Sequence, residues 1–270
     1  MSITWREVPD PVHARPGPAG WARAVARGGP LTVLLVLGLA IKMAIRLVER
    51  PLCGPRRPVS PWVTVLVCRG ALALLGIRLE VAGRPMRGPG AMVANHSSWL
   101  DIFALNALAP IVFVAKSEVA DWPGIGHLAR ATGTLFIRRE ARGEVAEQAL
   151  AITGRLTHGE TLLFFPEGTS TDGRRVLPFK PALFAGLLAP GLPERLAVQP
   201  VTLSWVSPEG EDPRFYGWWG GMEFGSHALS VLASRRAGRV RVTYHAPIRV
   251  AGRDRKSLGA EAETAVRSAL

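Results

Sequence analysis

Beyond residue 90, short apolar runs alternate with longer stretches of helical periodicity. The runs that predict strands are "AMVAN" at 91–95, "IVFVA" at 111–115, "TLFIR" at 134–138, "TLLFF" at 161–165, "AVQPVTLSWV" at 197–206 and "RVRVTYHAP" at 239–247. The helical stretches between them are 99–108, 125–132, 142–157, 179–188 and 226–234, with a last helix at the C-terminus. Strands that alternate with helices are typical of a mostly parallel sheet flanked by helices. We therefore predict one α/β domain over residues 81–270.

The longest apolar run precedes this domain. Residues 31–41, "LTVLLVLGLAI", carry no charged side chain over 11 positions, whereas a membrane-spanning helix needs about 20 apolar residues. Lys42, Arg46 and Arg50 follow at intervals of four, so they share one face of a helix. The pattern favours a helix that lies along a membrane surface. The alternative is a single span over residues 31–48 whose basic ends reach the head groups.

A second helix is predicted in "WVTVLVCRGALALLGI" at 62–77, where Arg69 interrupts the apolar positions. The turn "RPLCGPRRPVSP" at 50–61 separates it from the first helix. We therefore expect a membrane-associated helical hairpin over residues 31–80, lying in one leaflet. Residues 1–30 carry Pro, Gly and Arg without periodicity, which predicts a mobile basic arm.

Basic residues are concentrated in the same N-terminal part. The net charge is +12; residues 1–90 hold 13 Lys/Arg against 4 Asp/Glu, and residues 91–270 hold 20 against 17. Basic residues beside apolar helices are typical of proteins that bind anionic membranes. Nucleic-acid-binding proteins more often place this charge on a folded recognition element with interleaved aromatic residues. We therefore expect membrane lipids as partners, and no nucleic acid.

The stretch "ANHSSWLDIF", Ala94–Phe103, places a histidine where a predicted strand gives way to a helix. In parallel sheets, ligands bind at such junctions. His96 and Asp101 can form a hydrogen bond that fixes the imidazole tautomer and leaves the other ring nitrogen as a general base. The alternative is that Ser98 and Asp101 form a capping box, which would explain both residues without chemistry. The spacing alone leaves both interpretations open.

Two further stretches end predicted strands with polar residues. "LLFFPEGTSTDG", Leu162–Gly173, is either a turn with an exposed acid or a loop in which Glu167 binds a hydroxyl and the backbone at Gly168 approaches a ligand. "GTLFIRR", Gly133–Arg139, ends in two arginines, which are either solvated or hold a phosphate or carboxylate in a bidentate manner. Both stretches are candidate parts of a binding site.

In chain order, "NHSSWLD", "AKSEVADWPGIG", "GTLFIRR", "FPEGTS" and "VQPV" resemble the sequence blocks of the glycerolipid acyltransferase family. They are most similar to those of the bacterial 1-acylglycerol-3-phosphate acyltransferases. The resemblance covers about residues 91–201. The form H-x-x-x-x-D is weak evidence by itself, but several blocks in order are specific. The family's α/β sheet domain, often preceded by a membrane-binding helix pair, agrees with the independent pattern analysis.

The resemblance implies a role for each matching residue. His96 would be the general base that takes the proton from a lipid hydroxyl, and Asp101 would orient it. The hydroxyl would attack an acyl thioester of coenzyme A or acyl carrier protein directly, so no nucleophilic side chain, metal or other cofactor is expected. Arg139 would contact an anion, and a backbone N–H near Gly168 could stabilise the oxyanion. The other residues expected at the substrate are Asn95, Lys116, Glu167, Gly168, Thr169 and Arg174.

Two lysolipid acceptors are consistent with the resemblance. The main expectation is transfer to 1-acylglycerol-3-phosphate, giving phosphatidate, at the cytoplasmic face of the inner membrane. Many family members, however, have arginine directly after E-G-T, where this chain has Ser170; Arg174, Arg175 or Lys180 could supply that charge. "FPEGTSTDGRRVLPFK" and "YGWWGGMEF" are similar to the branch that acylates lyso-ornithine lipid, which is the alternative acceptor. A non-catalytic lipid-binding protein of the same fold is the alternative from another class.

Overall fold

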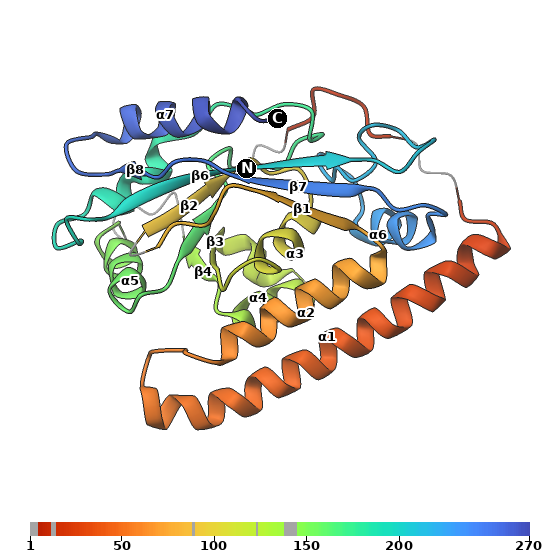
Figure 1. Cartoon of the computed structure of the whole chain (residues 1–270), viewed down its shortest axis with the longest axis horizontal. Coiled ribbons are helices and arrows are strands. Elements are labelled where there is room, and N and C mark those ends of the chain that lie inside the picture. Colours follow the sequence, from red (N-terminus) through yellow and green to blue (C-terminus); the bar gives the residue numbers. More distant parts are fainter. Residues whose placement is uncertain (1–4, 12–14, 88–89, 123, 138–144) are drawn as a thin grey trace.

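A computed structural model describes residues 5–11, 15–87, 90–122, 124–137 and 145–270 (Figure 1). Its strands are β1 (Arg78–Ala82), β2 (Gly90–Ala94), β3 (Val112–Lys116), β4 (Leu135–Ile137), β5 (Leu162–Phe164), β6 (Ala197–Val206), β7 (Arg239–Tyr244) and β8 (Ile248–Arg249). Its α-helices are α1 (Pro18–Cys53), α2 (Ser60–Leu75), α3 (Leu100–Asn106), α4 (Ile125–Thr132), α5 (Val145–Thr157), α6 (Phe224–Ala233) and α7 (Arg255–Arg267). Two 3-10 helices are η1 (Ser117–Asp121) and η3 (Pro181–Leu188).

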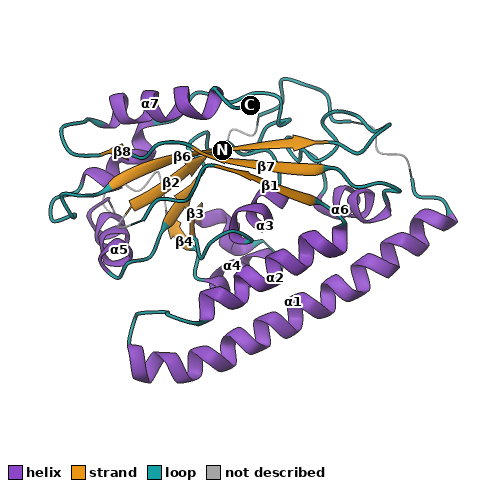
Figure 2. Cartoon of the chain, in the orientation of Figure 1, coloured by secondary structure: helices purple, strands orange, loops and turns teal. Residues whose placement is uncertain are grey.

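The strands form one sheet in the order β1-β7-β6-β2-β5-β3-β4, with β8 paired to β6. Neighbouring strands run parallel except where β6 meets β7 and β8. In Figure 2 the helix α7 lies on one side of this sheet, and α2 and α3 lie on the other. The predicted α/β fold, with a mostly parallel sheet flanked by helices, is therefore confirmed.

One strand falls inside the range that was expected for the helical hairpin. Gly76 ends α2 in the left-handed conformation, with a φ of 71°, and "RLEVA" then pairs with β7 as strand β1. The predicted boundary of the hairpin region at residue 80 was therefore wrong by three residues, because residues 78–80 belong to the sheet. The cause is local, because a left-handed glycine stops a helix and lets the chain turn onto the sheet.

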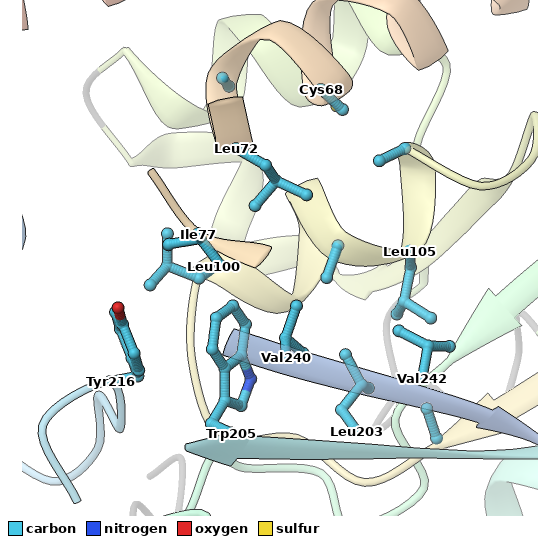
Figure 3. Packing of buried hydrophobic residues seen from close by; sticks show 14 of the residues in the cluster. Cys68, Leu72, Ile77, Leu100, Leu105, Leu203, Trp205, Tyr216, Val240 and Val242 are labelled. Atoms are coloured by element: carbon cyan, nitrogen blue, oxygen red, sulfur yellow. The ribbon is translucent and has the colours of Figure 1, made fainter. Parts of the chain in front are cut away.

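The core lies on both faces of the sheet, because alternate residues of a strand point to opposite sides. Met92 and Ala94 of β2 belong to one cluster of buried residues, and Ala91 and Val93 belong to the other. In the first cluster, side chains of α2 face those of α3 and of strands β6 and β7 (Figure 3). Helix α2 therefore packs into the core of the α/β domain as well as pairing with α1.

Helix α1 is 36 residues long, which corresponds to about 54 Å. It begins at Pro18, so residues 18–30 are helical, and the predicted arm over residues 1–30 was wrong for them. Proline fits the first position of a helix. Arg23 and Arg27 donate hydrogen bonds to backbone carbonyls at the C-terminal end of α6 and hold this part of α1 against the domain. These contacts are tertiary, so periodicity could not reveal them.

The two helices pack closely as a hairpin. A Cβ atom at Gly38 would collide with Val67, and one at Gly70 would collide with Leu34. Among the described residues, α1 is the one helix whose length and composition would allow it to cross a membrane. Its exposed large apolar residues are Trp21, Val25, Val33, Val36, Leu37, Ile41, Met43, Leu47, Val48 and Leu52. The hairpin itself is thus confirmed, and its position in one leaflet stays a prediction.

Candidate active site

The candidate site lies at the edge of the sheet where the parallel strands end. β2 leads directly into His96, β5 leads into the loop that contains Glu167, and β3 ends at Lys116. Parallel strands end at the same edge of a sheet, so these segments meet there although they are far apart in the chain. The position expected from the sequence is the one that the structure shows.

The imidazole ring of His96 is held by a hydrogen bond at one edge and by an aromatic contact on one face. Its Nδ1 lies 2.9 Å from Asp101 Oδ2. Because a carboxylate only accepts hydrogen bonds, Nδ1 carries the hydrogen, and the neutral ring keeps a lone pair on Nε2. Phe165 stacks on the ring at a centroid distance of 4.0 Å. The side chain remains 21% exposed, and Nε2 has no hydrogen-bond partner in the described part of the chain, so it is available to accept a proton.

Asp101 is fully buried and accepts hydrogen bonds on both oxygens. Oδ2 accepts from the backbone N–H of Ser97 at 2.8 Å and of Ser98 at 2.9 Å, in addition to His96. Oδ1 accepts from Trp205 Nε1 at 2.7 Å and from Ser97 Oγ at 3.3 Å. The carboxylate therefore ties the start of α3 to the preceding turn and orients the imidazole at the same time. Only half of the predicted capping box is present, because Asp101 accepts the N–H of Ser98 whereas the Ser98 hydroxyl accepts from Leu100 N and not from Asp101 N.

Glu167 has a different role from the one that was expected. It is 1% exposed, and its two oxygens accept the backbone N–H groups of His96 and Leu177, both at 2.7 Å. The side chain therefore braces the His96 turn against its own loop, and the prediction that it binds a substrate hydroxyl is corrected. Burial raises the pKa of Glu167 to about 8, although both backbone hydrogen bonds act to lower it.

Gly168 and Thr169 are also occupied by contacts within the protein. The N–H of Gly168 donates to Phe165 O at 3.1 Å and closes a tight turn. Gly168 has a φ of 75°, a conformation that favours glycine. That N–H is not directed at a ligand, so an oxyanion contact from Gly168 itself is not supported. The Thr169 hydroxyl accepts the backbone N–H of Trp5 at 3.4 Å.

Asn95 was expected at the substrate, and the structure corrects this as well. The side chain is 1% exposed. Its amide donates to Leu203 O at 2.9 Å and accepts from Leu203 N at 2.8 Å. The amide thus continues the ladder between β2 and β6 by one step after β2 has ended. The fixed ladder sets the direction in which the next residue, His96, leaves the sheet.

The basic residues of the site differ in their ion pairs and in their exposure. Arg175 pairs with Asp172 at 3.1 Å and lies 5.0 Å over the Trp5 ring. Arg174 and Lys180 are exposed, whereas Lys116 is half-buried at the end of β3. Arg174 has no ion pair within the described segments. Arg139, the predicted anion contact, lies outside the described residues, so its role stays a prediction.

Sequence reasoning missed four groups that support the His96 turn. Trp205 bonds to Asp101 from β6, and Thr171 donates its backbone N–H to His96 O at 2.9 Å. The N–H of Trp218 donates to Ser97 O at 2.7 Å, which places the "YGWWGGMEF" loop against the site. Trp5 covers the loop after Glu167 and packs on Trp219. Each contact joins residues far apart in the chain, so no local pattern announced it.

The raised pKa of Glu167 predicts how stability depends on pH. Because its pKa rises from 4.5 to about 8 on folding, the folded protein holds this proton over an interval in which the unfolded chain has lost it. Stability should therefore fall as pH increases from about 5 to about 8. Urea unfolding of the full chain in detergent, at pH steps across this interval, should show a steeper decline for the wild type than for Glu167→Gln. Equal pH slopes for the two proteins would contradict this explanation.

Comparison with known proteins defines the class. Residues 78–204 match the model of the family described as Acyltransferase. The crystal structure of the 1-acyl-sn-glycerophosphate (LPA) acyltransferase from Thermotoga maritima superposes with a TM-score of 0.54 at 20% sequence identity, over 90% of this chain and 97% of that chain. The fold is therefore that of an acyltransferase.

Curated relatives extend the match to the whole chain. It is 51% identical over 267 residues to a lyso-ornithine lipid O-acyltransferase of Rhodobacter capsulatus, covering 98% of this chain and 96% of the relative. A protein of the same name from Brucella abortus is 34% identical, over 90% and 95% of the two chains. A 1-acyl-sn-glycerol-3-phosphate acyltransferase of Neisseria gonorrhoeae is 44% identical over 46% of this chain and 49% of its own. The chain belongs to the acyltransferase family, and it is a lysolipid acyltransferase.

Proposed function

We propose that this chain transfers a fatty acyl group from a thioester to the free hydroxyl of lyso-ornithine lipid. The similarity to lyso-ornithine lipid acyltransferases over nearly the full length of both chains carries this proposal. In sequence, the two Neisseria proteins named 1-acyl-sn-glycerol-3-phosphate acyltransferase match 46% of the chain. 1-Acylglycerol-3-phosphate, the acceptor that was first expected from the sequence, is therefore the second candidate.

The geometry of the histidine supports a direct transfer. As the lipid hydroxyl attacks the thioester carbonyl, its proton passes to Nε2 of His96, and the resulting imidazolium is stabilised by Asp101 through the 2.9 Å hydrogen bond at Nδ1. The tetrahedral intermediate then collapses, the carbon–sulfur bond breaks, and Nε2 returns the proton to the leaving thiolate. The step forms one ester, consumes one thioester and needs no covalent acyl-enzyme.

The charge around the acceptor loop also favours lyso-ornithine lipid. A phosphate monoester is best bound by arginines that are free to form bidentate pairs. Here Ser170 stands where many family members have arginine, and Arg175 is already paired with the buried Asp172. Lyso-ornithine lipid carries both an amine and a carboxylate. With Ser170 in place of an arginine and Arg175 paired, Arg174 is the exposed arginine of this loop without an ion pair among the described residues, and a single guanidinium suits one carboxylate better than a doubly charged phosphate.

The exposed apolar face of α1 and the basic balance of residues 1–90 support attachment to a membrane. The proposal places the enzyme at the cytoplasmic face of the inner membrane, where thioesters of coenzyme A or acyl carrier protein are available as donors. The lysolipid would then reach His96 from the membrane and the thioester would reach it from the aqueous side.

A competition between the two acceptors tests this assignment. The purified full-length enzyme is given equal concentrations of lyso-ornithine lipid and 1-acylglycerol-3-phosphate with one acyl thioester. Initial rates in this mixture report the ratio of the two kcat/KM values. We expect the lyso-ornithine product to form at least about tenfold faster, a difference of about 1.4 kcal/mol in the transition state. Faster formation of phosphatidate would overturn the assignment and leave the lysolipid acyltransferase class intact.

A further inference from the structure

A cavity lies at the opposite edge of the sheet from His96. It has a volume of about 1070 Å³ and lies between the turn of the α1–α2 hairpin and the segments that lead into β2, β3 and β5. This volume is at the upper end of the range that is usual for small-molecule sites. Because the strands begin at this edge and end at the candidate active site, the cavity is separate from the acyl-transfer chemistry.

Lys42 supplies a buried positive charge to this cavity. The residue is 4% exposed, and it lines the cavity from helix α1, directly after the apolar run at 31–41. Its Nζ donates to Thr64 Oγ1 at 2.7 Å and to Thr132 O at 3.4 Å. Both partners are neutral, and no carboxylate of the described residues lies within ion-pairing distance. A buried ammonium without a counter-charge is costly, so an anion in the cavity would stabilise the protein.

Arg57 adds a second charge that is only partly neutralised. Its Nε is buried and has no hydrogen-bond partner among the described residues. Oε1 of Glu160 lies 3.6 Å from this Nε, and Oε2 of the same carboxylate accepts a hydrogen bond from Arg155 at 2.8 Å, so two arginines share one acid. The charged residues in the lining are Lys42, Arg56 and Arg57 against Glu160 alone, a net charge of +2. Because Arg57 shares Glu160 with Arg155, its charge is only partly balanced, and the positive lining attracts an anion to this cavity.

An apolar groove adjoins the basic cavity and indicates the source of the anion. The groove is lined by Ala44, Ile45, Val48, Glu49 and Val59, and it shares Leu52, Cys53 and Pro58 with the cavity. Glu49 is its one charged residue; its carboxylate accepts the backbone N–H groups of Val59 and Ser60 and pairs with Arg46 at 3.4 Å, so its charge is already balanced within the protein. A ligand that fits both has an anionic head and an aliphatic chain. We propose that the cavity binds the phosphate head group of an anionic phospholipid whose chain follows this groove on the hairpin. The proposal does not depend on which lysolipid the enzyme acylates.

Lipid titration of the full-length enzyme in detergent tests this site. Binding is followed by the thermal unfolding midpoint and by native mass spectrometry, with phosphatidylglycerol, phosphatidylcholine of the same chains, and inorganic phosphate as probes. We expect one phosphatidylglycerol per chain, a raised midpoint, and at least about tenfold weaker binding of phosphatidylcholine. Equal binding of both lipids would overturn the proposal. A full effect of inorganic phosphate alone would overturn the lipid as the source of the anion.

Substitutions place the binding in this cavity. Lys42→Met removes the charge and keeps the chain length in an apolar helix, and Arg57→Gln removes the forked donor. Each should weaken phosphatidylglycerol binding by about tenfold or more. Arg50→Gln is the matched control, because Arg50 is an exposed cation on the same end of α1 that does not line the cavity. Wild-type affinity in Lys42→Met and Arg57→Gln would overturn the site.

Discussion

Replacing His96 with alanine is expected to lower acyl transfer by at least about 10²-fold, which is about 2.7 kcal/mol of transition-state stabilisation. The reason is that Nε2 is the group placed to take the proton from the acceptor hydroxyl. Folding should be kept, because the ring is partly exposed and Asp101 retains its hydrogen bonds from Ser97, Ser98 and Trp205. Initial rates at saturating thioester, together with circular dichroism of the purified variant, measure both parts of this prediction.

The matched control is His127→Ala, since His127 is an exposed histidine on α4, outside the His96 turn. It should have wild-type activity. Near-normal transfer by folded His96→Ala protein would contradict the general-base mechanism, whatever the acceptor is.

Asp101→Asn is expected to be as severe as the loss of His96, and for two separable reasons. The amide cannot stabilise an imidazolium as a carboxylate does. It also places an NH₂ group where only acceptors fit. In one orientation the NH₂ faces His96 Nδ1–H and the N–H groups of Ser97 and Ser98, and in the other it faces Trp205 Nε1–H. We expect at least about a 10²-fold loss of kcat/KM together with a lower unfolding midpoint.

Trp205→Phe separates the two effects. It removes one donor to Oδ1 of Asp101 and leaves Oδ2 with His96 unchanged. The loss of one buried hydrogen bond should cost about 1 kcal/mol of stability, while activity should fall only a few-fold. If Trp205→Phe and Asp101→Asn lose activity equally, Asp101 acts through packing alone and its role in orienting the imidazole is refuted.

The fold was largely predictable because its signals are local. Apolar runs of strand length between amphipathic stretches predicted the sheet, and all six predicted strands overlap β2 to β7. The start of α1 was missed because "RGGP" at 27–30 has the composition of a turn. In the folded protein, Arg23 and Arg27 hold those turns of α1 against the end of α6. Contacts between distant segments therefore outweigh the weak local propensity.

In the site, too, local contacts could be predicted from the sequence and contacts between distant segments could not. His96 and Asp101 are five residues apart, so their hydrogen bond could be predicted from spacing at a strand-to-helix junction. Glu167 and Asn95 were assigned to the substrate because a polar residue in a binding motif suggests a ligand. Glu167 bonds to backbone groups 71 and 10 residues away, and Asn95 bonds to one 108 residues away; no spacing rule identifies the two distant partners. Only the folded structure shows that the polar atoms of both side chains bond to backbone groups and so position His96.

The most direct test of the central claim is a lipid profile of cells that lack this protein. Mass spectrometry should show lyso-ornithine lipid accumulating and its acylated product disappearing. The wild-type chain should restore the product, and a chain with His96→Ala, expressed at the same level, should not. Unchanged ornithine lipids with accumulation of 1-acylglycerol-3-phosphate would contradict the proposed acceptor. Full restoration by the His96→Ala chain would contradict the proposed mechanism.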